Sequence, residues 1–245
     1  MTISSARRAI LFLAIAHLAV AQDWARTRLD KSPRHRERTS LKHDGRSIDT
    51  LVILPEGRDK KPVVLVIHDN GGMNDWVAAM ADEIARMGYV VVAPTLAGQK
   101  DASSDLNAVA DYTRQLPSSN GTLFAVGFGW GGEQSFRFAA TRQDVAAALV
   151  FYGASPDKES IAHIQGSIFG FYAGADERVN STVAPAQAAA KAAGVVFEAV
   201  TYPGVGAGFM QSGDAPDAKP ADKQARGYAL ERMKSVLDMV ALRGY

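Results

Sequence analysis

The sequence predicts an α/β fold, with one mostly parallel, doubly wound sheet and helices on both of its faces. Two observations lead to this prediction. Short, almost uninterrupted apolar runs, such as residues 62–68 (PVVLVIH) and 89–93 (YVVVA), are typical of strands buried on both faces. Segments with helical spacing separate these runs, and such alternation builds a parallel sheet. Ligands of such sheets bind beyond the carboxyl ends of the strands.

The remaining elements follow in order along the chain. Residues 47–54 alternate in polarity like a strand, and Asn74 is a suitable N-cap for a helix that Gly88 ends. No linker interrupts the pattern, so we expect residues 47–245 to form one domain. The pattern further predicts helices at 105–116, 131–140, 184–193 and 221–242, and strands at 122–128, 146–152, 167–172 and 195–202.

The first 21 residues have the composition of a signal peptide. Arg7 and Arg8 precede a short apolar stretch, and residues 19–21 (Ala-Val-Ala) form a small-residue cleavage site. The stretch is too short to span a bilayer as a stable helix. We therefore expect cleavage before Gln22 and export to the periplasm or the medium, without a membrane span. An N-terminal helix that stays on the protein is the alternative.

The charge of the chain excludes a general affinity for nucleic acid. The sequence has 27 Lys and Arg side chains and 26 Asp and Glu; Arg7 and Arg8 leave with the signal peptide, so 25 basic side chains remain against 26 acidic. Residues 22–46 are locally basic and are interpreted as a solvated N-terminal arm. The chain has no cysteine, which excludes both disulfides and a thiol nucleophile.

The most informative segment is Gly-Phe-Gly-Trp-Gly-Gly at 127–132, between a predicted strand and a predicted helix. Its frame is that of a nucleophile elbow, G-x-Nuc-x-G, in which a strand turns sharply into a helix. The central position is Gly129. Two later segments also follow strands: YAGADERV contains Asp176, and YPGVGAGFM contains Ala207.

With VIHDN at 66–70, these ordered motifs resemble the dienelactone hydrolase family, which has the α/β-hydrolase fold. The resemblance covers roughly residue 47 to the C-terminus. It implies that Gly129 stands at the nucleophile position, that Asp176 is the surviving triad acid, and that Ala207 stands at the histidine position. It further implies a ligand pocket with an oxyanion hole formed by backbone N–H groups, at Asp69, Asn70, Trp130 and Gln211. Asp69 replaces the family's glutamate, and Gln211 an arginine that can meet a substrate carboxylate.

The two replacements predict a protein without the family's covalent chemistry. Glycine offers no attacking atom and alanine accepts no proton, whereas acyl transfer needs both functions. We expect a catalytically impaired or ligand-binding relative, whose ligand is a small ester, lactone or carboxylate. A weak hydrolase that uses water and the oxyanion hole is the alternative. We expect no cofactor, and no metal because zinc-type spacing is absent; the oligomeric state stays open.

Two other interpretations of the elbow region remain at this stage. Chemistry could have moved to Ser135 with His68 as its base, although His68 is expected to hydrogen-bond backbone at a strand end. Residues 127–132 also satisfy G-x-G-x-x-G, the dinucleotide motif. That motif belongs in the first βα unit, with an acid about 20 residues on, and neither condition is met here.

Overall fold

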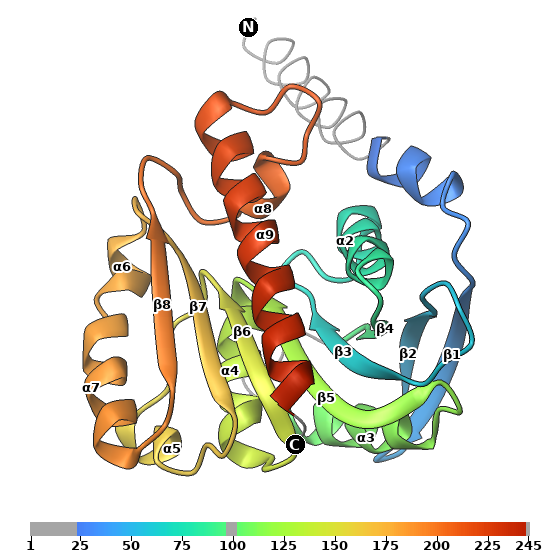
Figure 1. The fold of residues 1–245 in the computed structure, drawn as a ribbon, viewed down its shortest axis with the longest axis horizontal. Coiled ribbons are helices and arrows are strands. Elements are labelled where there is room, and N and C mark those ends of the chain that lie inside the picture. The colour runs from blue at the N-terminus through green and yellow to red at the C-terminus, as the bar shows by residue number, and fades with distance from the viewer. Residues whose placement is uncertain (1–23, 97–101, 244–245) are drawn as a thin grey trace, which may run out of the picture.

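The computed structural model describes residues 24–96 and 102–243 (Figure 1). Within these ranges, eight strands form one sheet in the order β1-β2-β4-β3-β5-β6-β7-β8. The six strands from β4 to β8 along this order run parallel to one another. Strand β2 is antiparallel to both β1 and β4. The predicted mostly parallel α/β sheet is therefore confirmed.

The elements alternate along the chain as the sequence pattern predicts. The strands are β1 Arg36–His43, β2 Arg46–Ile53, β3 Lys61–Ile67, β4 Val90–Pro94, β5 Ser119–Phe128, β6 Val145–Phe151, β7 Ser167–Ala173 and β8 Phe197–Tyr202. The helices are α2 Asp75–Arg86, α3 Ser103–Gln115, α4 Trp130–Thr141, α5 Lys158–Ile161, α6 Glu177–Asn180, α7 Val183–Ala193, α8 Phe209–Ser212 and α9 Pro220–Arg243.

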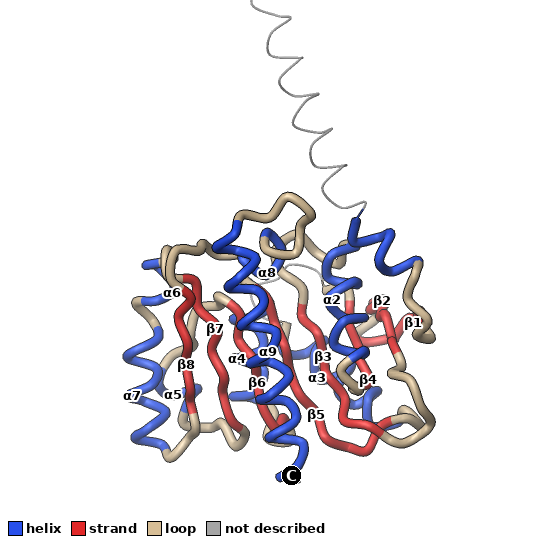
Figure 2. The backbone as a smooth tube through the Cα atoms, turned by 45° about the horizontal axis from the view of Figure 1, so that its top comes forward, coloured by secondary structure: helices blue, strands red, loops and turns tan. Residues whose placement is uncertain are grey.

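Helices cover both faces of the sheet and enclose two cores (Figures 1 and 2). One core holds side chains of α2 and α9, and the other holds side chains of α3, α4 and α7. Strand β5 supplies both, because its side chains alternate: Phe124 and Val126 enter the first core, and Leu123 and Ala125 the second. The central strands are thus buried on both faces, which explains their unbroken apolar runs.

Most boundaries agree with the prediction to within a few residues. The side chain of Asn74 accepts a hydrogen bond from the Val77 N–H at 3.0 Å, so the predicted N-cap of α2 is confirmed. Helix α2 ends at Arg86, and Gly88 follows with φ 102°, a left-handed conformation suited to glycine. Strand β8 begins at Phe197, two residues later than predicted. The signal peptide prediction lies outside the described residues.

The solvated arm predicted at residues 22–46 is wrong for the part that the structure describes. Residues 24–30 are helical, with Ala25 and Leu29 buried, and β1 pairs with β2 along its full length. Asp44 and Gly45 form the hairpin turn with positive φ. The charges misled the prediction because β1 is an edge strand, where charged side chains prevent pairing with another chain.

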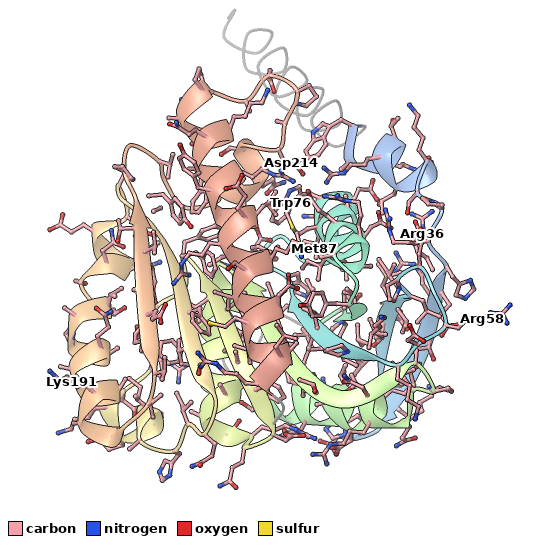
Figure 3. All side chains as sticks on the ribbon, viewed as in Figure 1. Arg36, Arg58, Trp76, Met87, Lys191 and Asp214 are labelled. Carbon is pink, nitrogen blue, oxygen red and sulfur yellow. The ribbon has the colours of Figure 1, made fainter. Side chains whose placement is uncertain are left out.

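Two ion pairs, one of them buried, hold this N-terminal segment on the domain. Arg34 donates to both carboxylate oxygens of Asp82 on α2, at 3.0 and 2.6 Å, and the Ser32 hydroxyl donates to the same carboxylate at 2.6 Å. The Arg34 and Asp82 side chains are 9% and 6% exposed. Arg28 makes a two-pronged pair with Asp214, which precedes α9 and lies between α9 and α2 in Figure 3. The segment is therefore an integral layer of the domain.

We predict that Asp82→Ala lowers the free energy of unfolding by about 3–5 kcal/mol, because the buried Arg34 guanidinium loses both short hydrogen bonds and keeps only the exposed Glu56, at 3.9 Å. Urea unfolding followed by circular dichroism measures the loss. Asp59, whose side chain is 88% exposed, provides the control, and Asp59→Ala should change stability by less than about 0.5 kcal/mol. Equal effects of the two substitutions would show that the N-terminal segment is not held in this way.

Candidate active site

The elbow predicted at residues 127–132 joins β5 to α4. Gly129 is the N-cap residue of α4 and has φ 56° and ψ −116°. Its N–H donates to the Phe151 carbonyl at 2.9 Å, and its carbonyl accepts from the Glu133 N–H at 3.1 Å. A side chain in this backbone conformation is strained, whereas glycine adopts it freely. The chain thus keeps the sharp strand-to-helix turn of a nucleophile elbow, with glycine at its tip.

The neighbouring glycines are required by close packing. A Cβ added at Gly127 would lie 1.9 Å from the Gly131 carbonyl oxygen. A Cβ at Gly131 would lie 2.3 Å from the carbonyl oxygens of both Ile67 and His68, and one at Gly132 would lie 2.7 Å from the Phe151 oxygen. The first turn of α4 therefore rests directly on the backbone of β3 and β6. This contact brings Trp130 beside the segment that contains Asp69 and Asn70.

His68 is committed to the backbone, as the sequence predicted. Its Nε2 accepts from the Leu96 N–H at 3.0 Å, so the ring proton resides on Nδ1, which donates to the Asp69 carbonyl at 2.7 Å. The ring is 2% exposed and stacks on Trp130 at 5.7 Å. Ser135 is fully buried and donates to the Gly132 carbonyl at 2.8 Å. These contacts exclude Ser135 and His68 as a relocated nucleophile and base.

The other predicted positions lie on loops at the same edge of the sheet. Asp176 follows β7 and Ala207 follows β8, so both lie beyond the carboxyl ends of parallel strands, as Gly129 does. Backbone bonds join their loops: Gly174 N–H donates to the Tyr202 carbonyl at 2.8 Å, and Ala175 N–H to the Val205 carbonyl at 3.0 Å.

The predicted site residues differ in how exposed their side chains are. The Asp176 carboxylate caps α6, accepting from the Val179 N–H at 3.1 Å. Ala207 and Asn70 are exposed, while Gln211 on α8 and Asp69 are half-buried. The Asp69 carboxylate accepts from the Gly71 N–H at 2.8 Å.

Tyr152 is a residue of this site that sequence reasoning missed. It follows β6 and has φ 40°, a strained conformation for a non-glycine residue. Its ring lies 3.9 Å from a Cβ built at Gly129 and packs edge-on against Phe209 at 5.4 Å. Burial, and then the negative charge of Asp69, raise the pKa of the Tyr152 phenol well above its usual value, so it stays protonated at neutral pH. Tyr152 thus connects the nucleophile position to the loop after β8.

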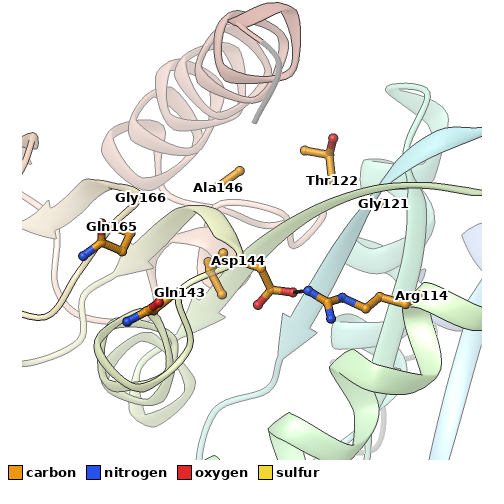
Figure 4. Close-up of a pocket in the computed structure, with 9 residues that line it drawn as sticks. Arg114, Gly121, Thr122, Gln143, Asp144, Ala146, Gln165 and Gly166 are labelled. Carbon is orange, nitrogen blue, oxygen red and sulfur yellow. Dashed lines mark hydrogen bonds and ion pairs between the residues drawn. The ribbon is translucent and has the colours of Figure 1, made fainter.

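A separate hollow of about 340 Å³ lies at the opposite, amino-terminal edge of β5, β6 and β7 (Figure 4). None of the predicted site residues lines it. Arg114 and Asp144 there form an ion pair, so their charges satisfy each other. Within the described residues, no group of three or more His, Cys, Asp or Glu is placed to hold a metal ion, and no helix is long and apolar enough to cross a membrane.

The sequence profile of the dienelactone hydrolase family matches residues 48–105 and 95–241. The chain belongs to the dienelactone hydrolase family. It is 26% identical over 183 residues to a protein of Methylorubrum extorquens named as a carboxymethylenebutenolidase, an alignment that spans 60% of this chain and 63% of that relative, which is less than two thirds of its length. A relative of the same name from Escherichia coli is 24% identical over 206 residues, with 70% of this chain and 76% of the relative aligned.

The solved structures support the α/β-hydrolase fold. A dienelactone hydrolase-like promiscuous phosphotriesterase from metagenomic libraries superimposes with a TM-score of 0.75 at 17% identity, covering 84% of this chain and 98% of that structure. The turn from β5 into α4, with φ 56° at Gly129, fits the elbow predicted at residues 127–132. The alternative dinucleotide motif is not supported, because β5 is not in the first βα unit and β6 ends in Phe151 without an acid.

We predict that Gly127→Ala prevents folding or lowers the free energy of unfolding by more than about 3 kcal/mol, because the new Cβ would collide with backbone rather than with a movable side chain. Gly206, in the loop after β8, has no atom within 4 Å of an added Cβ, so Gly206→Ala is the matched control and should be nearly neutral. Soluble yield and melting temperature measure both. A well-folded Gly127→Ala protein of unchanged melting temperature would refute this account of the elbow.

Proposed function

We propose that this protein is an exported, ligand-binding member of the dienelactone hydrolase family that lacks the family's covalent chemistry. The observation that carries the proposal is the glycine at the tip of an intact elbow. The backbone of Gly129 has the left-handed conformation expected of a nucleophile elbow, but the residue has no side-chain atom to attack a carbonyl. Ala207 adds a second loss, because it cannot take or return a proton.

The backbone parts of the proposed site do not depend on the side chains at positions 129 and 207. The first turn of α4 lies against the end of β3, so the N–H groups of Asn70 and Trp130 are available in this proposal as the oxyanion hole. In a model protease, binding and an oxyanion hole alone retain on the order of 10³–10⁴-fold acceleration over water after the triad is removed. Any hydrolysis by this protein should therefore be slow.

The proposed ligand is a small ester, lactone or carboxylate. The two relatives described above are named as carboxymethylenebutenolidases, which points to an unsaturated lactone that carries a carboxylate. Gln211 stands where the family often has an arginine, so a neutral ester or lactone fits this site better than a ligand that carries a carboxylate. Titration calorimetry with 4-nitroacetanilide, a non-hydrolysed analogue of 4-nitrophenyl acetate, and with carboxymethylenebutenolide tests binding. Absence of heat with both would contradict the proposal.

We predict that Gly129→Cys combined with Ala207→His restores covalent chemistry. The thiol supplies the attacking atom and the imidazole its base, oriented by Asp176. Each single variant should stay near the wild-type rate on 4-nitrophenyl acetate, and the double variant should exceed both by on the order of 10²-fold or more. It should also show a burst of 4-nitrophenol, the signature of an acyl-enzyme.

Stability measurements on the same variants provide the control. Gly129→Cys should lose on the order of 1–3 kcal/mol of stability, because it puts a side chain at φ 56°. Ala207→His should lose little, since Ala207 is exposed. A double variant that folds but reacts no faster than the single ones would show that positions 129, 176 and 207 do not form a triad geometry.

We predict that export removes residues 1–21. Mass spectrometry of the periplasmic or secreted protein should find Gln22 as the first residue. Export of a chain that still begins with Met1 would contradict the signal peptide, as would a chain retained in the cytoplasm.

A further inference from the structure

The side chains of Asp69 and Tyr152 lie nearest to the position that a side chain at residue 129 would occupy. A Cβ built on Gly129 lies 3.5 Å from the Cβ of Asp69 and 3.9 Å from Cε2 of Tyr152, both ordinary contact distances. The side chain of a nucleophile at this position would therefore project between these two residues. With glycine, that position is left to solvent or ligand, and Asp69 is the acidic side chain next to it.

Asp69 is held in place and retains the capacity to accept a proton. One carboxylate oxygen accepts from the Gly71 N–H at 2.8 Å, and the Asp69 carbonyl accepts from His68 Nδ1 at 2.7 Å. Both bonds fix the turn at the end of β3. A carboxylate has about four lone-pair sites, so the bond to Gly71 leaves the others for a water molecule.

Tyr152 closes the other side of this space. The residue is 5% exposed, and its N–H donates to the Phe171 carbonyl at 2.8 Å, which maintains the strained φ of 40°. Strain of this kind persists where the surrounding structure enforces it, and it is concentrated at functional sites. Because burial and Asp69 both raise its pKa, the phenol remains neutral and does not compete with Asp69 as a base.

We propose that Asp69 is a catalytic general base, and that it activates a water molecule at the position beside Gly129 for direct attack on a bound ester or lactone. This inference rests on the proposed function, since it needs a ligand in the same site. The water takes the place of the nucleophile side chain, and Tyr152 confines it. No acyl-enzyme forms, so neither a nucleophile at 129 nor a histidine at 207 is required.

The water oxygen forms a bond to the acyl carbon while one of its protons moves to the Asp69 carboxylate. The carbonyl electron pair moves onto the carbonyl oxygen, where the Asn70 and Trp130 N–H groups would stabilise it. The carbonyl then re-forms, the bond to the leaving oxygen breaks, and the proton on Asp69 passes to that oxygen. The products are a carboxylic acid and an alcohol, joined in one molecule when the substrate is a lactone.

The test compares hydrolysis of 4-nitrophenyl acetate with binding of 4-nitroacetanilide in the full chain. Asp69→Asn should lower the rate above the buffer background by on the order of 10²-fold, the scale of general-base catalysis, while the anilide still binds. Gly129→Ala should also lower the rate, because its methyl group takes up part of the space in which the water would lie. Asp59→Asn, a change of the same charge at a side chain that is 88% exposed, should leave the rate unchanged.

A second measurement separates a base from a structural role. In Asp69→Gly, added formate should recover part of the lost rate in proportion to its concentration, because it supplies a carboxylate in the same place. Rescue by formate can be measured even where Gly129→Ala fails to fold. Two results would overturn the inference and leave the proposed function intact, provided that the wild-type protein binds the anilide. In the first, Asp69→Asn does not lower the wild-type rate of hydrolysis. In the second, the wild-type protein shows no hydrolysis above background. If the wild-type protein binds neither the anilide nor the lactone, both the inference and the proposed function are overturned.

Discussion

The close contact between backbone segments at the elbow is the constraint on which the rest of the site depends. Strand β5 can turn directly into α4 because glycines let the first turn of the helix touch the carbonyl oxygens of β3 and β6. That contact determines where Trp130 lies, how near Asp69 comes to Gly129, and how Tyr152 must bend. Atoms packed at these distances leave no room for adjustment, since protein interiors are as dense as organic crystals. The elbow therefore sets the geometry of the site without any catalytic side chain.

This arrangement explains how the elbow can form with glycine at position 129. The elbow is stabilised by backbone hydrogen bonds and by glycine packing, and neither uses the side chain at 129. His68 adds two further bonds that hold the turn after β3 against Leu96. Glycine adopts φ 56° without the strain that a side chain would bring, so glycine at position 129 favours stability. Asp176 also has a structural function, because its carboxylate caps α6.

The sequence predicted the features that arise from local pattern. Continuous apolar runs identified the central strands, Asn74 identified the start of α2, and the glycine spacing at 127–132 identified the elbow. The features that depend on tertiary contacts were missed. The many charged side chains of residues 22–46 gave no sign that Arg34 would be buried with Asp82, because only the folded chain brings residues 48 positions apart together. Tyr152 likewise looked like the last residue of an apolar strand. Its contact with the nucleophile position results from the order of β5 and β6 in the sheet.

The docking of the N-terminal helix bears on the order in which cleavage and folding take place. Ala25 is fully buried, only four residues after Ala21, where the sequence predicts cleavage. The folded domain holds residues 24–30 as a helix against its core, whereas a peptide that is bound as an added strand has to be extended. If the chain is cut there, the cut precedes docking of this helix. The N-terminal helix would then dock on the domain only after the signal peptide has been removed.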